Sequence, residues 1–178
     1  MATETGQAED KKDFAEPKLT RLRELFRYDP ETGAWTHLKA RQRVRAGTPA
    51  GSPYGGLGYW RLSVDGRGYL AHRLAWLYMT GEWPKLQIDH INGDRADNRW
   101  SNLRLASNGQ NKANSRRARN NTSGYKGVQY NARLGRWYSS VTARGHRTYL
   151  GCFSTPQEAH RAYLAMAERL HGEYARAG

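Results

Sequence analysis

A strand–loop–strand–helix pattern in the middle of the chain constrains its fold more than any other feature. Two short apolar runs, at 86–91 and 103–106, flank a long polar loop and have the length of buried strands. Ser107, with Gln110 three residues later, forms a capping box, so a helix should begin there and run towards Arg119. The sequence therefore predicts two paired strands followed by a helix.

Four polar side chains fall on this predicted frame. Asp89 and His90 lie in the first strand, Asn102 precedes the second, and Asn111 lies in the helix. A carboxylate and a carboxamide oxygen can ligate a divalent cation, and an imidazole with a pKa near neutrality can act as a general base. Hydrolysis of a phosphodiester needs both groups. Taken singly, each residue is equally well explained as a turn, a cap or a surface pair.

The segment from Ile88 to Arg104 strongly resembles the HNH endonucleases. The similarity is closest to the subset from phages and mobile introns in which the last His of the motif is replaced by Asn. Asn92-Gly93 and Asp97-Asn98-Arg99 match the intervening turns of that motif. The resemblance extends over about residues 19 to 118 and implies a ββα-metal nuclease core.

The same resemblance implies a role for each of the four residues. His90 is expected to be the general base, and Asp89 and Asn111 are expected to ligate the metal. Asn102 should brace the loop against the strand that carries the base, as a catalytic-site residue that does not touch the metal. The all-oxygen donor set favours one Mg²⁺ or Mn²⁺ per active site over Zn²⁺.

Four neighbouring residues are interpreted as structural. Asn98 and Arg99 are assigned to the loop, with Arg99 a candidate phosphate contact. Asn114 is expected to be solvated on the helix surface, although it could approach the metal or DNA. His72, at the start of a predicted helix, is expected to pack or to form hydrogen bonds and not to take part in catalysis.

Charge and composition narrow the class of partner. The 178-residue chain has 29 Lys and Arg against 16 Asp and Glu, a net charge of +13, and a single cysteine, Cys152. Such a surface attracts a polyanion, and nucleic acid is the first candidate. A basic membrane-binding protein is the alternative, but the chain has no long apolar run and its mean hydropathy is −0.93. One cysteine excludes an internal disulfide and a cysteine-based zinc knuckle.

The N-terminal half shows several local signals. Residues 1–18 are polar, without the apolar core of a signal peptide, and are expected to be a flexible tail of an intracellular protein. A short amphipathic helix should follow near 19–26. Asp65-Gly66 predicts a tight hairpin turn, and a helix at 71–80 should end at Gly81.

The C-terminal part predicts a second unit after a basic linker at 115–122. Thr155, Pro156 and Glu158 form the start of a long amphipathic helix. Before it, Gly-punctuated runs predict three strands, at 125–130, 136–143 and 148–153. The overall expectation is an α+β protein with a tail (1–18), a nuclease domain (19–118) and a second domain (119–178).

This second unit resembles the Apetala-type (ethylene-response-factor) DNA-binding domain over about residues 121 to 174. The resemblance is carried by Gly124–Val128, Gly135–Trp137, Tyr149–Phe153 and the Glu158-Ala159 helix. It implies a three-stranded sheet that lies in the DNA major groove. The Arg-rich first strand of the plant domain is here Gln129-Tyr130-Asn131, so the plant recognition site should not be transferred.

Strand alternation sorts the side chains of this sheet into two faces. The residues expected to face the helix are Val128, Trp137, Ser139, Val141, Thr148 and Leu150. Those expected to face DNA are Gln129, Tyr138, Ser140, Thr142, Arg147 and Tyr149, because Gln and Arg can read base edges while Ser, Thr and Tyr can hold phosphates. Lys126, Arg133, Arg136 and Arg144 should contact DNA as well, the arginines by neutralising backbone charge near hairpin ends. A merely solvated face is the alternative.

Together these patterns predict a site-directed, homing-type DNA endonuclease. Double-stranded DNA is the expected partner, with neither a membrane nor a protein partner implied. A monomer or weak dimer is expected; a monomer with one site should nick, whereas a dimer would permit a double-strand break. The resemblance places the protein in the cytoplasm of a bacterial host, encoded by a phage. A DNA-binding regulator with an inactive nuclease domain is the alternative; an RNA-binding factor fits less well, because no RNA-recognition aromatic motif is present.

Overall fold

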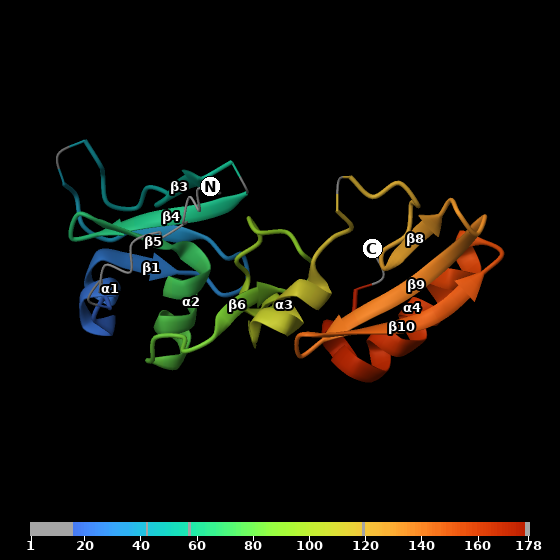
Figure 1. The fold of residues 1–178 in the computed structure, drawn as a ribbon. Helices are drawn as coiled ribbons and strands as arrows, with labels where there is room; N and C mark the ends of the chain where they lie inside the picture. The colour runs from blue at the N-terminus through green and yellow to red at the C-terminus, as the bar shows by residue number, and fades with distance from the viewer. Residues whose placement is uncertain (1–15, 42, 57, 119, 177–178) are drawn as a thin grey trace, which may run out of the picture.

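The computed structural model describes residues 16–41, 43–56, 58–118 and 120–176. Most of the expected N-terminal tail therefore lies outside the described residues. The chain forms a mixed α+β structure in which the N-terminal elements and the C-terminal elements gather at opposite ends, with α3 between them (Figure 1). Each end has its own hydrophobic core. Among the described residues, no helix combines the length and apolar character needed to cross a membrane.

The N-terminal end consists of short strands packed on two helices. Its core is formed by aromatic and leucine side chains such as Phe26, Trp35 and Leu74. The Asp65-Gly66 turn has positive φ at both residues, +49° and +80°, as a two-residue type I′ hairpin requires. The elements are α1 (Leu19–Leu25), β1 (Phe26–Tyr28), β2 (Trp35–His37), β3 (Ser52–Tyr54), β4 (Tyr59–Val64), β5 (Arg67–Leu70) and α2 (Ala71–Thr80).

The central elements follow the order predicted from the sequence. They are β6 (Gln87–His90), the 3₁₀ turn η1 (Trp100–Asn102), β7 (Leu103–Ala106) and α3 (Asn108–Asn114). β6 and β7 pair antiparallel, and the predicted capping box of Ser107 and Gln110 begins α3. The register sets Asp89 opposite Arg104.

The predicted extent of α3 is wrong: the helix ends at Asn114 and does not reach Arg119. Ser115 turns to an extended conformation, with φ −60° and ψ 145°, and its hydroxyl donates to the Lys112 carbonyl. The Nζ of Lys126 donates to the carbonyls of Ala113 and Ser115. The last carbonyls of the helix are thus satisfied by side chains instead of by a further helical turn.

The C-terminal unit, defined here as β8 through η2, is a three-stranded antiparallel sheet in the order β10–β9–β8, with α4 packed on one face (Figure 1). The first strand begins at Val128, later than predicted, because Gly127 has φ +74° and lies against the ring of Tyr163, where a Cβ would be only 2.0 Å away. The elements are β8 (Val128–Asn131), β9 (Arg136–Ala143), β10 (His146–Phe153), α4 (Pro156–His171) and η2 (Gly172–Tyr174).

Candidate active site

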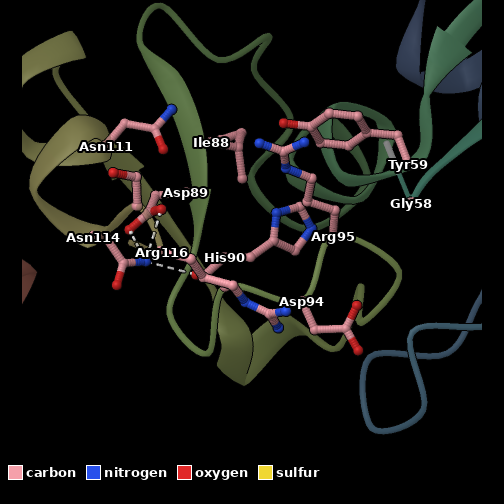
Figure 2. Close-up of a pocket in the computed structure, with 12 residues that line it drawn as sticks. Gly58, Tyr59, Ile88, Asp89, His90, Asp94, Arg95, Asn111, Asn114 and Arg116 are labelled. Carbon is pink, nitrogen blue, oxygen red and sulfur yellow. Dashed lines mark hydrogen bonds between the residues drawn. The ribbon is translucent and has the colours of Figure 1, made fainter. Parts of the chain in front are cut away.

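A cavity of about 500 Å³ opens where β6 and α3 meet (Figure 2). Asp89, His90 and Asn111 all line it, and Tyr59 of β4 forms part of the opposite wall. The structure thus brings three of the four predicted nuclease residues to one place. The fourth, Asn102, does not line the cavity.

Asp89 is a buried carboxylate that accepts three hydrogen bonds from two donor groups. Asn114 Nδ2 lies 2.9 Å from Oδ1 and 3.0 Å from Oδ2, and it also donates to the His90 carbonyl at 2.8 Å. Arg104 Nε donates to Oδ2 at 3.0 Å. A carboxylate offers about four acceptor positions. Oδ1 therefore keeps a lone pair that a further ligand can use.

His90 is held in one tautomer by its partner. Its Nε2 lies 3.3 Å from Asn98 Oδ1, and Asn98 Nδ2 donates to the Ala96 carbonyl at 3.1 Å, which fixes the orientation of the amide. Because Asn98 Oδ1 is an acceptor, Nε2 carries the proton and Nδ1 carries the lone pair. The rings of Tyr59 and His72 pack against the imidazole, at centroid distances of 6.2 and 5.0 Å.

Burial favours the neutral form of both histidines at this site. It lowers the pKa of His90, although the bond to Asn98 and the nearby Asp89 act in the opposite direction. Burial also lowers the pKa of His72, to about 3, and the proximity of His90 adds to this effect. His90 can therefore accept a proton at neutral pH, while His72 serves as an uncharged packing group.

Asn102 ties down the loop between β6 and β7. Its Oδ1 accepts from the Asn92 amide at 2.9 Å, and its Nδ2 donates to Asn92 Oδ1 at 3.0 Å and to the Asp97 carbonyl at 2.8 Å. Its carbonyl also accepts from the Ile91 amide at 2.9 Å. These four bonds close the loop directly behind His90.

Asn111 offers a neutral oxygen near Asp89. Its Nδ2 donates to Gln87 Oε1, which leaves Oδ1 as an acceptor. A carboxylate oxygen, an amide oxygen, water and phosphate form the kind of ligand set that Mg²⁺ or Mn²⁺ prefers. The described parts of the chain contain no group of three or more His, Cys, Asp or Glu side chains that could hold a metal. The donors at the cavity fit a hard cation that takes most of its ligands from solvent and substrate.

Two residues around Asp89 were missed or misjudged from the sequence. Asn114, expected to be solvated, is buried and contacts both Asp89 oxygens. Arg104 was assigned no role, yet it pairs with Asp89 across the two strands. The strand register could have identified Arg104, because opposite residues in an antiparallel pair share a face.

Asn98, assigned to the loop from the sequence, also contributes to the site. It is buried, and its side chain contacts His90 while its carbonyl accepts a bond from the Tyr28 hydroxyl at 2.7 Å. Nothing in the sequence pattern distinguished it from its neighbours Asp97 and Arg99. These two form an ion pair with each other, 2.6 Å between Oδ2 and Nη2, in which only Arg99 is exposed.

Two arginines add positive charge to the cavity wall. Arg95 and Arg116 line it together with Asp94 (Figure 2). Arg95 stacks over the Tyr59 ring, with its Cζ 4.9 Å from the ring centroid. Two guanidinium groups beside two carboxylates and one imidazole can bind a phosphate-containing ligand.

The outer-face residues predicted for the C-terminal sheet lie together on one face. Tyr138 contacts Gln129 through its hydroxyl, and its ring centroid is 6.4 Å from that of Tyr149. Arg147 Nε donates to Ser140 Oγ at 2.9 Å. The strand register that unites them pairs Gln129 with Tyr138, Ser140 with Tyr149, and Thr142 with Arg147.

One prediction about this region needs correction. Thr148 lies opposite buried Val141 and so shares the helix-side face as predicted, although it is exposed on the edge strand β10. Lys126, expected to contact DNA, is not on the outer face. Its Nζ is directed at the carbonyls of Ala113, Ser115 and Arg176, and burial lowers its pKa to about 8.

The remaining predicted arginines occupy the sheet ends. Arg133 and Arg136 lie at the β8–β9 turn and Arg144 at the β9–β10 turn, all exposed. Arg144 also lines a second cavity of about 800 Å³, together with Ser107 and other residues from both ends of the molecule. The three arginines are therefore divided between the two ends of the sheet.

Comparison with known proteins assigns the central segment. Residues 69–113 match the HNH endonuclease family. The chain is also 33% identical to Protein 3.8 of Escherichia phage T7 over 106 residues, which span 59% of this chain and 87% of that protein. No solved structure matches the chain significantly. The chain therefore belongs to the same family as Protein 3.8 of Escherichia phage T7, and its residues 69–113 are an HNH endonuclease domain.

Proposed function

We propose that this protein is a divalent-metal-dependent endonuclease that hydrolyses phosphodiester bonds in double-stranded DNA with His90 as general base. The observation that carries the proposal is the cavity lined together by His90, Asp89 and Asn111, with His90 Nε2 3.3 Å from Asn98 Oδ1. A neutral imidazole, a carboxylate and an amide oxygen supply the groups that metal-assisted hydrolysis requires. The HNH match over residues 69–113 supports this assignment and the ββα-metal architecture of the core.

Asp89 and Asn111 would hold one Mg²⁺ or Mn²⁺. Such an ion, when bound, supplies charge stabilisation at phosphorus and at the departing oxygen. Asp89 suits this task because its Oδ1 accepts only the Asn114 bond, whereas Oδ2 accepts two. Asn114 and Arg104 hold the carboxylate in a fixed orientation.

The side chains of the chain then divide the remaining work. His90 Nδ1 accepts the proton of the attacking water, while Asn98 holds the opposite ring nitrogen in its protonated state. Arg95 and Arg116 bind the phosphate oxygens at the cavity wall. Asn102 keeps the β6–β7 loop closed behind the base.

We further propose that residues 119–178 form a DNA-binding domain of the Apetala type, tethered to a nuclease domain at 19–118. The outer face of its sheet gathers polar, aromatic and basic side chains, and its helix covers the other face. In this arrangement the sheet contributes affinity and register, and the tether raises the local concentration of DNA at the cutting site. A monomer with one such site would nick DNA in a homing-type, site-directed manner. The phage relative supports a phage-encoded protein that acts in a bacterial host.

The proposal is tested with supercoiled plasmid and purified protein in Mg²⁺. Relaxation to the nicked circle is expected. DNA ligase should reseal the product directly, because hydrolysis of the bond between phosphorus and the 3′ oxygen leaves 5′-phosphate and 3′-hydroxyl ends. Plasmid that stays supercoiled in both Mg²⁺ and Mn²⁺ would favour a DNA-binding regulator with an inactive nuclease domain. Nicks that ligase cannot seal would contradict cleavage of the bond between phosphorus and the 3′ oxygen.

A further inference from the structure

The end of the C-terminal unit returns to the nuclease site. After α4, residues 172–176, here called the C-terminal strap, lie against the β6–β7 pair and its loop. The Tyr174 hydroxyl donates to the Leu105 carbonyl at 2.8 Å, and Arg176 Nη1 donates to the Asn92 carbonyl at 2.8 Å. The strap therefore contacts β7 and also the β6–β7 loop, part of which lines the cavity.

The strap also packs against one side of the Arg104 guanidinium. Arg104 Nη1 donates to the Glu173 carbonyl at 3.0 Å, and its Cζ lies only 3.8 Å from the centroid of the Tyr174 ring. On its other side, Arg104 Nε donates to Asp89 Oδ2 at 3.0 Å. One arginine thus contacts the strap and the expected metal ligand at the same time.

The order of the Arg104–Asp89 ion pair depends on the groups packed around it. The side chain of Arg104 is only 12% exposed and that of Asp89 only 4%. A buried ion pair stays ordered only where further hydrogen bonds and packing compensate the lost hydration. On the side of Arg104 away from Asp89, the Tyr174 ring and the Glu173 carbonyl provide part of that compensation, while Nη2 is buried without a hydrogen-bond partner among the described residues.

We propose that Tyr174 is a positioning residue for the nuclease site and acts through Arg104 on the Asp89 carboxylate. The proposal rests on the function proposed above. It means that a segment at the far end of the C-terminal unit completes the metal-binding geometry of the HNH domain. Productive cutting then depends on the docked C-terminal unit even on DNA that its sheet does not recognise.

The test compares Tyr174→Ala and Tyr174→Phe with Tyr130→Ala. Tyr130 is a matched control because it is a half-exposed tyrosine of the same unit that packs on Trp137. Three quantities are measured on the full chain: Mn²⁺ affinity without DNA by electron paramagnetic resonance, affinity for random-sequence DNA in a chelator, and the single-turnover nicking rate. Thermal melting reports whether each variant is folded.

Tyr174→Ala should weaken Mn²⁺ affinity and slow nicking by about tenfold, the usual scale for a residue that supports a metal ligand. DNA affinity should remain within about twofold of wild type. Tyr174→Phe, which keeps the ring over the guanidinium, should recover most of the loss, and Tyr130→Ala should match wild type. If Tyr174→Ala only loosened the docking of the C-terminal unit, DNA affinity and melting temperature would fall instead. Tyr174→Phe and Tyr174→Ala would then have the same Mn²⁺ affinity.

A double-variant cycle isolates the path through Arg104. If Tyr174 acts through Arg104, Arg104→Ala with Tyr174→Ala should be no worse in Mn²⁺ affinity than Arg104→Ala alone. Additive losses, an unchanged affinity in folded Tyr174→Ala, or tighter Mn²⁺ binding would overturn the proposal. Failure of the proposed function looks different: the wild type itself would neither nick DNA nor differ from Asp89→Asn in Mn²⁺ binding.

Discussion

The side-chain amide of Asn114 bridges both oxygens of the Asp89 carboxylate, at 2.9 and 3.0 Å. Asn114 belongs to α3 and Asp89 to β6, so this contact fixes the helix against the strand at the site. The same amide nitrogen donates to the His90 carbonyl. One side chain therefore sets the position of Asp89, the proposed metal ligand, relative to His90, the proposed base.

Replacement of Asn114 by alanine should destabilise the protein by about 2 kcal/mol, because it leaves a buried carboxylate short of a donor. The nicking rate should also fall, since the Asp89 side chain would be free to rotate. Denaturant unfolding and single-turnover nicking measure the two effects. Asn108→Ala, at the exposed start of α3, is the control and should change neither. A fully active and equally stable Asn114→Ala variant would show that the bridge is dispensable.

Replacement of Asn98 by alanine should slow nicking while DNA affinity is unchanged. The Asn98 amide is the group that keeps the proton on His90 Nε2, so its loss allows the tautomer with no lone pair at Nδ1. We expect a loss of about tenfold or more, on the scale of other residues that orient a catalytic group. Asn120→Ala, exposed in the linker, is the control. An unchanged rate would mean that Asn98 only supports the loop.

Metal binding should depend on the Asn111 amide oxygen. Asn111→Ala should weaken Mn²⁺ binding by about tenfold, since it removes one of two protein ligands, and a chelator should abolish nicking in the wild type. Titration of Mn²⁺ followed by electron paramagnetic resonance gives the affinity. Cleavage that persists in excess chelator would contradict the metal-dependent account, and unaltered affinity in Asn111→Ala would remove Asn111 from the site.

The arginines at the β8–β9 turn should set part of the salt dependence of DNA binding. Each phosphate contact contributes about 0.9 to the slope of log affinity against log salt. The double variant Arg133→Ala, Arg136→Ala should therefore lower the slope by about 1.8 on random-sequence duplex. Arg27→Ala, an exposed arginine of β1, should leave it unchanged. Equal slopes for all three proteins would argue against DNA contact at this turn.

Local signals in the sequence located most of the frame of the site. The Ser107–Gln110 capping box placed the start of α3, and the two apolar runs placed β6 and β7. These signals are visible because they depend on residues close together in the chain. The Asp65-Gly66 hairpin was predictable for the same reason, since few residues other than Asn, Asp and Gly adopt positive φ readily.

Contacts between distant segments could not be predicted in this way. Asn114 looked like a solvated helix residue because the docking angle of α3 on β6 decides whether it points inward. Lys126 was predicted to contact DNA from its charge alone. Its actual partners, the carbonyls at 113, 115 and 176, come from two segments that are distant in the sequence. The strap contact of Tyr174 with Arg104 has the same character. Each depends on tertiary packing that local patterns do not contain.

The most direct test of the central claim is single-turnover nicking of supercoiled plasmid in Mg²⁺ by wild type, His90→Ala and His146→Ala. His90 lines the cavity, whereas His146 is exposed at the start of β10. Loss of a general base should slow nicking by about a hundredfold or more, while His146→Ala should match wild type. If His90→Ala nicked as fast as wild type, the cavity at Asp89 and His90 would not be the site of cleavage.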